Sequence, residues 1–148
     1  RQVRAALRAA VRPEVLPLSF AQRRLWFLHR LEGPNATYNM PMALHLTGNL
    51  TVEALRSAVQ DVVDRHESLR TVFPEIDGTP YQQILHGEQA RIELPVHHIE
   101  RERLNEELSR AAQYAFDLGR ELPLRAVLFG AGGEHVLLLV LHHVAGDG

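Results

Sequence analysis

The sequence contains no cysteine and no lysine, and each absence narrows the possible functions. Without cysteine the chain can form neither a disulfide nor a thiol nucleophile, and nothing favours an oxidising compartment, so we expect a cytoplasmic protein. All 16 basic residues are arginine, and a net charge of −2 gives no general positive field for nucleic acid. No apolar run is long enough to cross a membrane, and residues 1–12 lack the apolar core of a signal peptide. We therefore expect neither a nucleic-acid nor a membrane partner.

The most informative segment is the C-terminal sequence HHVAGDG, residues 142–148. It follows a continuously apolar run, residues 136–141, which predicts a strand covered on both faces. Because successive side chains of a strand point to opposite faces, His142 and His143 are expected to diverge, one into the core and one into a cleft. A titratable imidazole at the end of a buried strand suits a base for acyl transfer. For His142 a hydrogen-bonded structural role is favoured.

The same segment places an aspartate between two glycines. Gly146 and Gly148 would give the backbone freedom around Asp147, whose carboxylate could bond a nearby N–H or an arginine. A metal site made of His142, His143 and Asp147 is the rival interpretation. Zinc requires convergent ligands, whereas neighbouring strand residues diverge and no cysteine is available, so we expect no metal.

Hydrophobic periodicity predicts alternating helices and strands. Ser19 and Gln22 form a capping box that starts a helix, whose wide apolar surface predicts that most of it is buried. Thr51 caps a second helix, and residues 104–115 form a third. Strands are predicted at 39–46, at 69–76 and 81–86 (a hairpin around Asp77-Gly78), and at 124–129 and 135–142 (a pair joined through 130–133). A second histidine pair, His97-His98, lacks a glycine-flanked aspartate and is expected on the surface at a strand end. Mixed strands and long helices indicate an α/β layer structure.

Three segments resemble the motifs of the condensation domains of non-ribosomal peptide synthetases, which belong to the chloramphenicol acetyltransferase-like superfamily. The sequence HHVAGDG resembles their core motif, residues 19–28 (SFAQRRLWFL) the first motif, and residues 65–73 (RHESLRTVF) the second. The motifs stand in the family's order and the resemblance covers residues 16–148. It implies an α/β fold, a chloramphenicol acetyltransferase-like lobe with a mixed β-sheet packed with helices. Residues 1–15 would be a linker or short helix.

The resemblance also implies a reaction. The family forms an amide (peptide) bond between a donor acyl or aminoacyl thioester and an acceptor aminoacyl thioester, both held on carrier proteins. His143 takes the position of the catalytic histidine, either as general base or as the group that orients the amine. Supporting roles are implied for His142, Asp147 and Gly148 of the same motif, and a bracing role at the active-site floor for Arg65 and Arg70 of the second motif.

The implied partners are an upstream donor and a downstream acceptor peptidyl carrier protein, the C-terminal lobe of the same domain, and an adjacent adenylation domain. The lobe itself would bind no cofactor, since the substrates are carried on the 4′-phosphopantetheine of the carrier proteins. Condensation domains have two lobes, and residues 16–148 correspond to the N-terminal one, so we expect this lobe alone to be inactive. Two alternatives remain open: a non-catalytic module that docks carrier proteins, and an epimerisation-type relative with the same motif.

Overall fold

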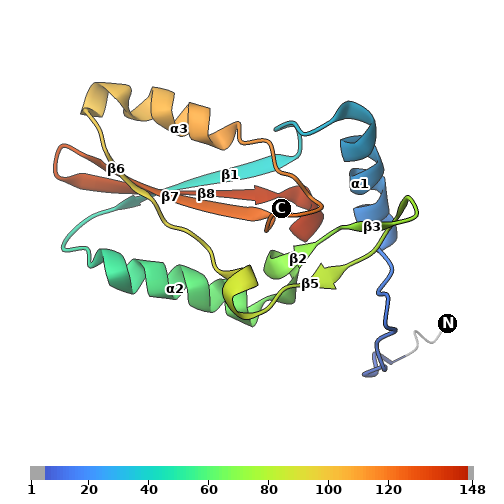
Figure 1. Cartoon of the computed structure of the whole chain (residues 1–148). Helices are drawn as coiled ribbons and strands as arrows, with labels where there is room; N and C mark the ends of the chain where they lie inside the picture. The colour runs from blue at the N-terminus through green and yellow to red at the C-terminus, as the bar shows by residue number, and fades with distance from the viewer. Residues whose placement is uncertain (1–5, 147–148) are drawn as a thin grey trace, which may run out of the picture.

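The centre of the molecule is a four-stranded mixed β-sheet with the strand order β1-β8-β7-β6. The structure is a computed structural model that describes residues 6–146 (Figure 1). Strand β8 (Glu134–His142) is antiparallel to both of its neighbours, β1 (Asn39–Leu46) and β7 (Leu124–Ala131), and β6 (Val96–His98) is parallel to β7. This is the mixed sheet that the sequence predicts.

Three helices surround the sheet: α1 (Phe20–Glu32), α2 (Val52–Arg65) and α3 (Leu104–Ala112). In Figure 1, α3 lies above the sheet, α2 below it, and α1 to one side near the end of β8. The remaining regular elements are short: β2 (Thr71–Val72), β3 (Glu75–Ile76), β4 (Thr79–Pro80), β5 (Gln83–Ile84) and the 3-10 turns η1 (Glu67–Arg70), η2 (Gly87–Ala90), η3 (Arg101–Arg103) and η4 (His143–Ala145). No helix within residues 6–146 has the length and apolar character needed to span a bilayer.

The two central strands are buried on both faces, as their apolar runs predict. On β7, Val127 and Phe129 join one cluster of buried side chains, against which α1 and α3 pack. Ala126 and Leu128 alternate with them and join a second cluster with Val63 of α2. Alternating side chains of β7 thus enter the two hydrophobic clusters, one on each face of the sheet. Close packing on both faces restrains the end of the sheet.

The capping box at the start of α1 is confirmed. The N–H of Gln22 donates to Ser19 Oγ at 3.2 Å, and the N–H of Ser19 donates to Gln22 Oε1 at 2.8 Å. The expectation that most of α1 is buried is wrong: none of its residues is buried, and Phe20 is 91% exposed. The helix touches only one end of the sheet, so a narrow stripe that includes Leu25 and Trp26 reaches the core and the other apolar side chains remain on the surface. At α2, Thr51 is the N-cap residue, but its side chain makes no capping hydrogen bond.

The predicted hairpin around Asp77-Gly78 is present, with both residues in the left-handed region at φ 50° and 77°. This is the geometry that lets a two-residue turn follow the strand twist. The hairpin is divided into two ladders, β3–β4 and β2–β5. Between them Phe73 turns into the core, and its N–H donates to Leu118 O at 2.8 Å.

The pair β7–β8 forms as predicted, whereas α3 ends at Ala112, before the expected limit of the helix. Residues 6–15 form no helix.

Candidate active site

His142 is the last residue of β8 and is buried, with 3% of its surface exposed. Its Nδ1 accepts a hydrogen bond from the N–H of Val144 at 3.0 Å, which is possible only when that nitrogen carries no proton. Its backbone N–H donates to Pro123 O at 2.8 Å, and its ring meets Phe116 edge-on at 5.9 Å. His142 is therefore fixed by contacts on several sides and holds the turn that follows it.

The environment of His142 keeps its imidazole neutral. Loss of solvation on burial, followed by the nearby His29 and His143, lowers the pKa of His142 from 6.5 to about 4. Each of these causes disfavours a positive charge on the ring. At neutral pH the side chain thus remains a hydrogen-bond acceptor for Val144 and is poorly suited to take up a proton.

His143 begins the 3-10 turn η4 and faces the opposite way. Its backbone N–H donates to Tyr38 O at 2.9 Å, and its carbonyl accepts the N–H of Gly146 at 3.3 Å. Its side chain lines an open pocket of about 460 Å³. His142 therefore lies in the core and His143 lines a pocket, as expected, although His143 belongs to a 3-10 turn and not to the strand.

The pocket lies between the first turns of α1 and the turn η4. The side of α1 contributes Ser19, Ala21, Gln22, Arg24 and Leu25, and the other side contributes Tyr38, His143, Val144, Ala145 and Gly146. Arg24 adds a guanidinium group to this lining, and Tyr38 and Ser19 add hydroxyl groups. An imidazole beside polar groups in a pocket open to solvent can bind an amine and accept its proton.

The structure places the other motif residues elsewhere. Arg65 is exposed at the end of α2. Arg70 donates from Nη1 to Leu85 O at 3.1 Å and lies 3.2 Å from His86 Nδ1, so it braces the segment after β5. Neither arginine lines the pocket of His143. Asp147 and Gly148 lie outside the described residues.

The backbone conformation of Gly146 differs from the expectation that this position uses the special freedom of glycine. Its φ of 175° is ordinary extended backbone that any residue adopts, so the special freedom of glycine is not used at this position. A Cβ built on Gly146 would meet no atom within 4 Å. The turn is thus fixed by the hydrogen bonds of His142 and His143.

Within residues 6–146 no group of three histidine, aspartate or glutamate side chains is arranged to hold a metal ion. The second histidine pair lies on β6 with both side chains exposed, at the surface of a strand end as predicted. It lines no part of the His143 pocket.

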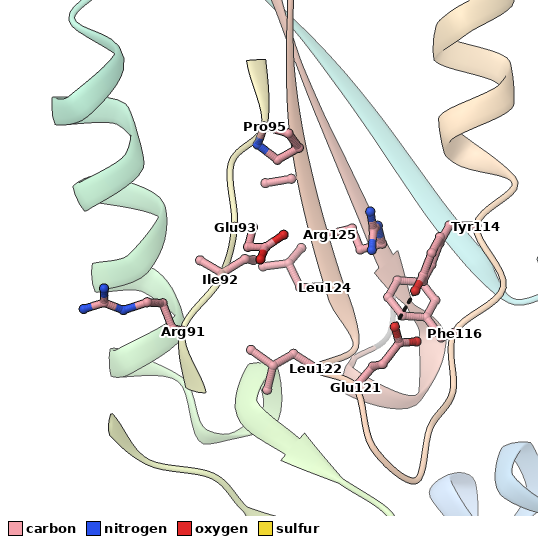
Figure 2. Close-up of a pocket in the computed structure, with 11 residues that line it drawn as sticks. Arg91, Ile92, Glu93, Pro95, Tyr114, Phe116, Glu121, Leu122, Leu124 and Arg125 are labelled. Atoms are coloured by element: carbon pink, nitrogen blue, oxygen red, sulfur yellow. Dashed lines mark hydrogen bonds between the residues drawn. The ribbon is translucent and has the colours of Figure 1, made fainter. Parts of the chain in front are cut away.

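A second pocket lies at the edge of β7 (Figure 2). In it the hydroxyl of Tyr114 donates to Glu121, which raises the pKa of Tyr114, and the guanidinium of Arg125 lies 3.8 Å from the centre of the Tyr114 ring. The lining residues include no histidine, serine or threonine. Because this pocket has no histidine to act as a base near neutral pH, the His143 pocket is the better candidate for acyl transfer.

Sequence reasoning missed the walls of the His143 pocket. Ser19 and Gln22 were interpreted only as the start of a helix, and Tyr38 had no assigned role near His143. The signal was present in part, because Ser19 and Gln22 belong to the first of the three motifs. The contact of Tyr38 with His143 depends on the pairing of β1 with β8, in which Asn39 lies opposite His142.

The family model described as "Condensation domain" matches residues 13–148. The chain belongs to the condensation-domain family. It is 60% identical over 148 residues to "Probable non-canonical nonribosomal peptide synthetase (NRPS) CymA" of Salinispora arenicola (strain CNS-205), covering 99% of this chain and 2% of that protein. It is 55% identical over 144 residues to "Dimodular nonribosomal peptide synthase" of Bacillus subtilis (strain 168), covering 97% and 6%.

Solved structures agree with this membership. The X-domain from teicoplanin biosynthesis superposes with a TM-score of 0.84 at 38% identity, over 95% of this chain and 30% of that one. The first condensation domain of the CDA synthetase superposes with a TM-score of 0.69 at 22% identity, over 87% and 35%, which shows the shared fold. The chain thus spans about a third of the solved condensation-domain chains and a few per cent of the curated synthetases. It has the chloramphenicol acetyltransferase-like α/β fold expected from its motifs.

Proposed function

We propose that this chain is the N-terminal lobe of a condensation domain that forms an amide bond between a donor thioester and an acceptor amine, both held on carrier proteins. The observation that carries the proposal is the position of His143 at the end of a buried strand, with its side chain in an open pocket. Its neighbour His142 faces the core and is held neutral. We therefore assign the chemistry to His143 and a supporting role to His142.

The chemistry proposed for His143 carries one proton from the attacking amine to the leaving thiolate, in two transfers. The amine nitrogen of the acceptor attacks the carbonyl carbon of the donor thioester, and the imidazole of His143 takes the proton that the nitrogen loses. The C–S bond then breaks, the phosphopantetheine thiolate takes this proton from the imidazolium of His143 and leaves as the thiol, and the amide remains. A general base contributes about 10²–10⁴-fold to such a step. A role in orienting the amine and stabilising the tetrahedral state is the second form of the same proposal.

The partners follow from the reaction. Two carrier proteins must present their phosphopantetheine arms, and a second lobe must complete the site around the pocket of His143. We propose that this lobe alone cannot hold both arms, because catalysis by proximity requires both reactants in one geometry. For Arg65 and Arg70 we propose bracing roles, supported at Arg70 by its bond to Leu85 O.

The test is the substitution His143→Ala in the intact parent synthetase. We expect single-turnover amide formation from loaded carrier proteins to fall about 10²–10⁴-fold, with an unchanged melting temperature. The matched control is His97→Ala, which removes an exposed imidazole from β6. Near-normal product from His143→Ala would contradict the proposal.

A second candidate function is a docking module without chemistry of its own. The observation that favours it is the 36% identity and TM-score of 0.84 to an X-domain solved in complex with OxyB, from teicoplanin biosynthesis. A docking module would retain its effect on product formation when His143 is replaced. The His143→Ala experiment therefore separates the two candidates.

A further inference from the structure

Gln82 lies between β4 and β5, on the second arm of the hairpin, and binds the segment that precedes α1. The backbone N–H of Gln82 donates to Leu16 O at 2.8 Å. Its side-chain Nε2 donates to Pro17 O, also at 2.8 Å. Gln82 thus binds two consecutive carbonyls of a segment that lies more than 60 positions away in the sequence, directly before the capping box of α1.

The side chain of Gln82 also reaches the first turn of the helix. Its Oε1 accepts a hydrogen bond from Gln22 Nε2 at 3.3 Å. The Oε1 of Gln22 in turn accepts the N–H of Ser19 at 2.8 Å. A continuous chain of amide hydrogen bonds therefore runs from Pro17 through Gln82 and Gln22 to Ser19, and every donor in it has an acceptor.

Two members of this chain belong to the pocket of His143, since Ser19 and Gln22 form part of its α1 wall. The facing wall is η4, held by His142 and by Tyr38. The distance between the walls depends on where the first turn of α1 sits. No residue of α1 is fully buried, although Leu25 and Trp26 pack against the core, so polar contacts at its N-terminus help to place the first turn.

We propose that Gln82 is a positioning residue for the His143 pocket: it fixes the first turn of α1, and so the wall that faces His143, without touching the reactants. This inference rests on the proposed function. Both ends of the Gln82 amide form hydrogen bonds. Glutamate would lose the donor to Pro17 O and would set a carboxylate against a carbonyl, and leucine would lose both bonds. A displacement of about 1 Å in such a wall can cost about 10²-fold in rate.

Two other contacts hold the entering segment when Gln82 is changed. Arg12 donates two hydrogen bonds to Glu67, at 3.1 Å and 2.6 Å. Leu18 is buried in the core cluster with Phe73 and Val144. The domain should therefore stay folded when Gln82 is substituted.

The experiment compares Gln82→Leu and Gln82→Glu in the intact synthetase with Gln83→Leu as the matched control. Gln83 is the next residue of the same hairpin and its side chain is exposed. We expect single-turnover amide formation at saturating carrier protein to fall at least about tenfold in both Gln82 variants and to stay at the wild-type rate in Gln83→Leu. Hydrogen exchange of the peptide that spans residues 19–25 should become faster in the Gln82 variants alone.

A double-mutant cycle separates positioning from a general loss of stability. If Gln82 acts in part through Gln22, the loss of rate in Gln22→Leu/Gln82→Leu is smaller than the product of the two single losses. Losses that multiply, or a wild-type rate in Gln82→Leu, would overturn the inference. If Gln82→Leu does not fold, Gln82→Glu and Gln22→Leu carry the same comparison.

Failure of the inference and failure of the proposed function give different results. If His143→Ala retains full activity, the proposed function fails, and unchanged exchange of residues 19–25 in the Gln82 variants would still refute the positioning role. If His143→Ala is inactive while the Gln82 variants are fully active, only the positioning role fails.

Discussion

Protonation of His142 should destabilise the condensation domain in mildly acidic solution. The side chain is buried, its Nδ1 accepts the N–H of Val144, and its pKa is lowered from 6.5 to about 4 by lost solvation and by the neighbouring His29 and His143. In the unfolded chain the same imidazole meets only water and titrates near its ordinary value. The two states thus bind different numbers of protons between these pH values.

The sign follows from proton linkage. Between pH 6.5 and about 4 the unfolded state carries the proton on His142 and the native state does not, so stability falls as the pH falls through this window. Above pH 6.5 the contribution is fully present, and below about pH 4 the loss levels off. At about 1.4 kcal/mol per pKa unit the loss is at most about 3 kcal/mol, a large part of a typical domain stability.

The assay is chemical denaturation of the complete domain at a series of pH values, with His142→Asn as the reference variant. The Oδ1 of asparagine can accept the N–H of Val144, but the side chain does not titrate. We expect the wild type to lose up to about 3 kcal/mol relative to His142→Asn between neutral pH and about pH 4. Parallel curves for the two proteins would refute the reasoning, because they would mean that His142 binds its proton equally in both states.

Two further predictions concern the side-chain hydrogen bonds of Asn39 on β1 and the effect of metal chelators. Asn39 donates from Nδ2 to Ala112 O at 3.0 Å and to Tyr114 O at 2.7 Å, so Asn39→Ala should lower the unfolding free energy by about 1–3 kcal/mol, and Asn39→Asp by more because it faces oxygen with oxygen. Urea midpoints that match the wild type would contradict this. Chelators should leave the melting temperature and the rate of amide formation unchanged, because His142 and His143 face opposite ways; one zinc ion per chain in the purified domain would contradict this.

The sequence alone determined the local elements. The capping box at Ser19 and Gln22, the Asp77-Gly78 turn and the apolar run before His142 each depend on residues close together in the chain. These local signals predict a helix start, a hairpin turn and a buried strand without any knowledge of the surrounding structure. The same local rule predicted that the two histidines diverge, and the motif order identified the family.

Only the tertiary structure decided which of these elements meet. The exposure of α1 could not be predicted from its apolar residues, because it depends on how much of the sheet the helix covers. The contact of Tyr38 with His143 and the bond between Gln22 and Gln82 join residues far apart in the sequence, and they exist because β1 pairs with β8 and the hairpin packs beside α1. The low pKa of His142 has the same origin. Burial, hydrogen bonding between distant segments and electrostatic environment are properties of packing, and packing is set by all the elements together.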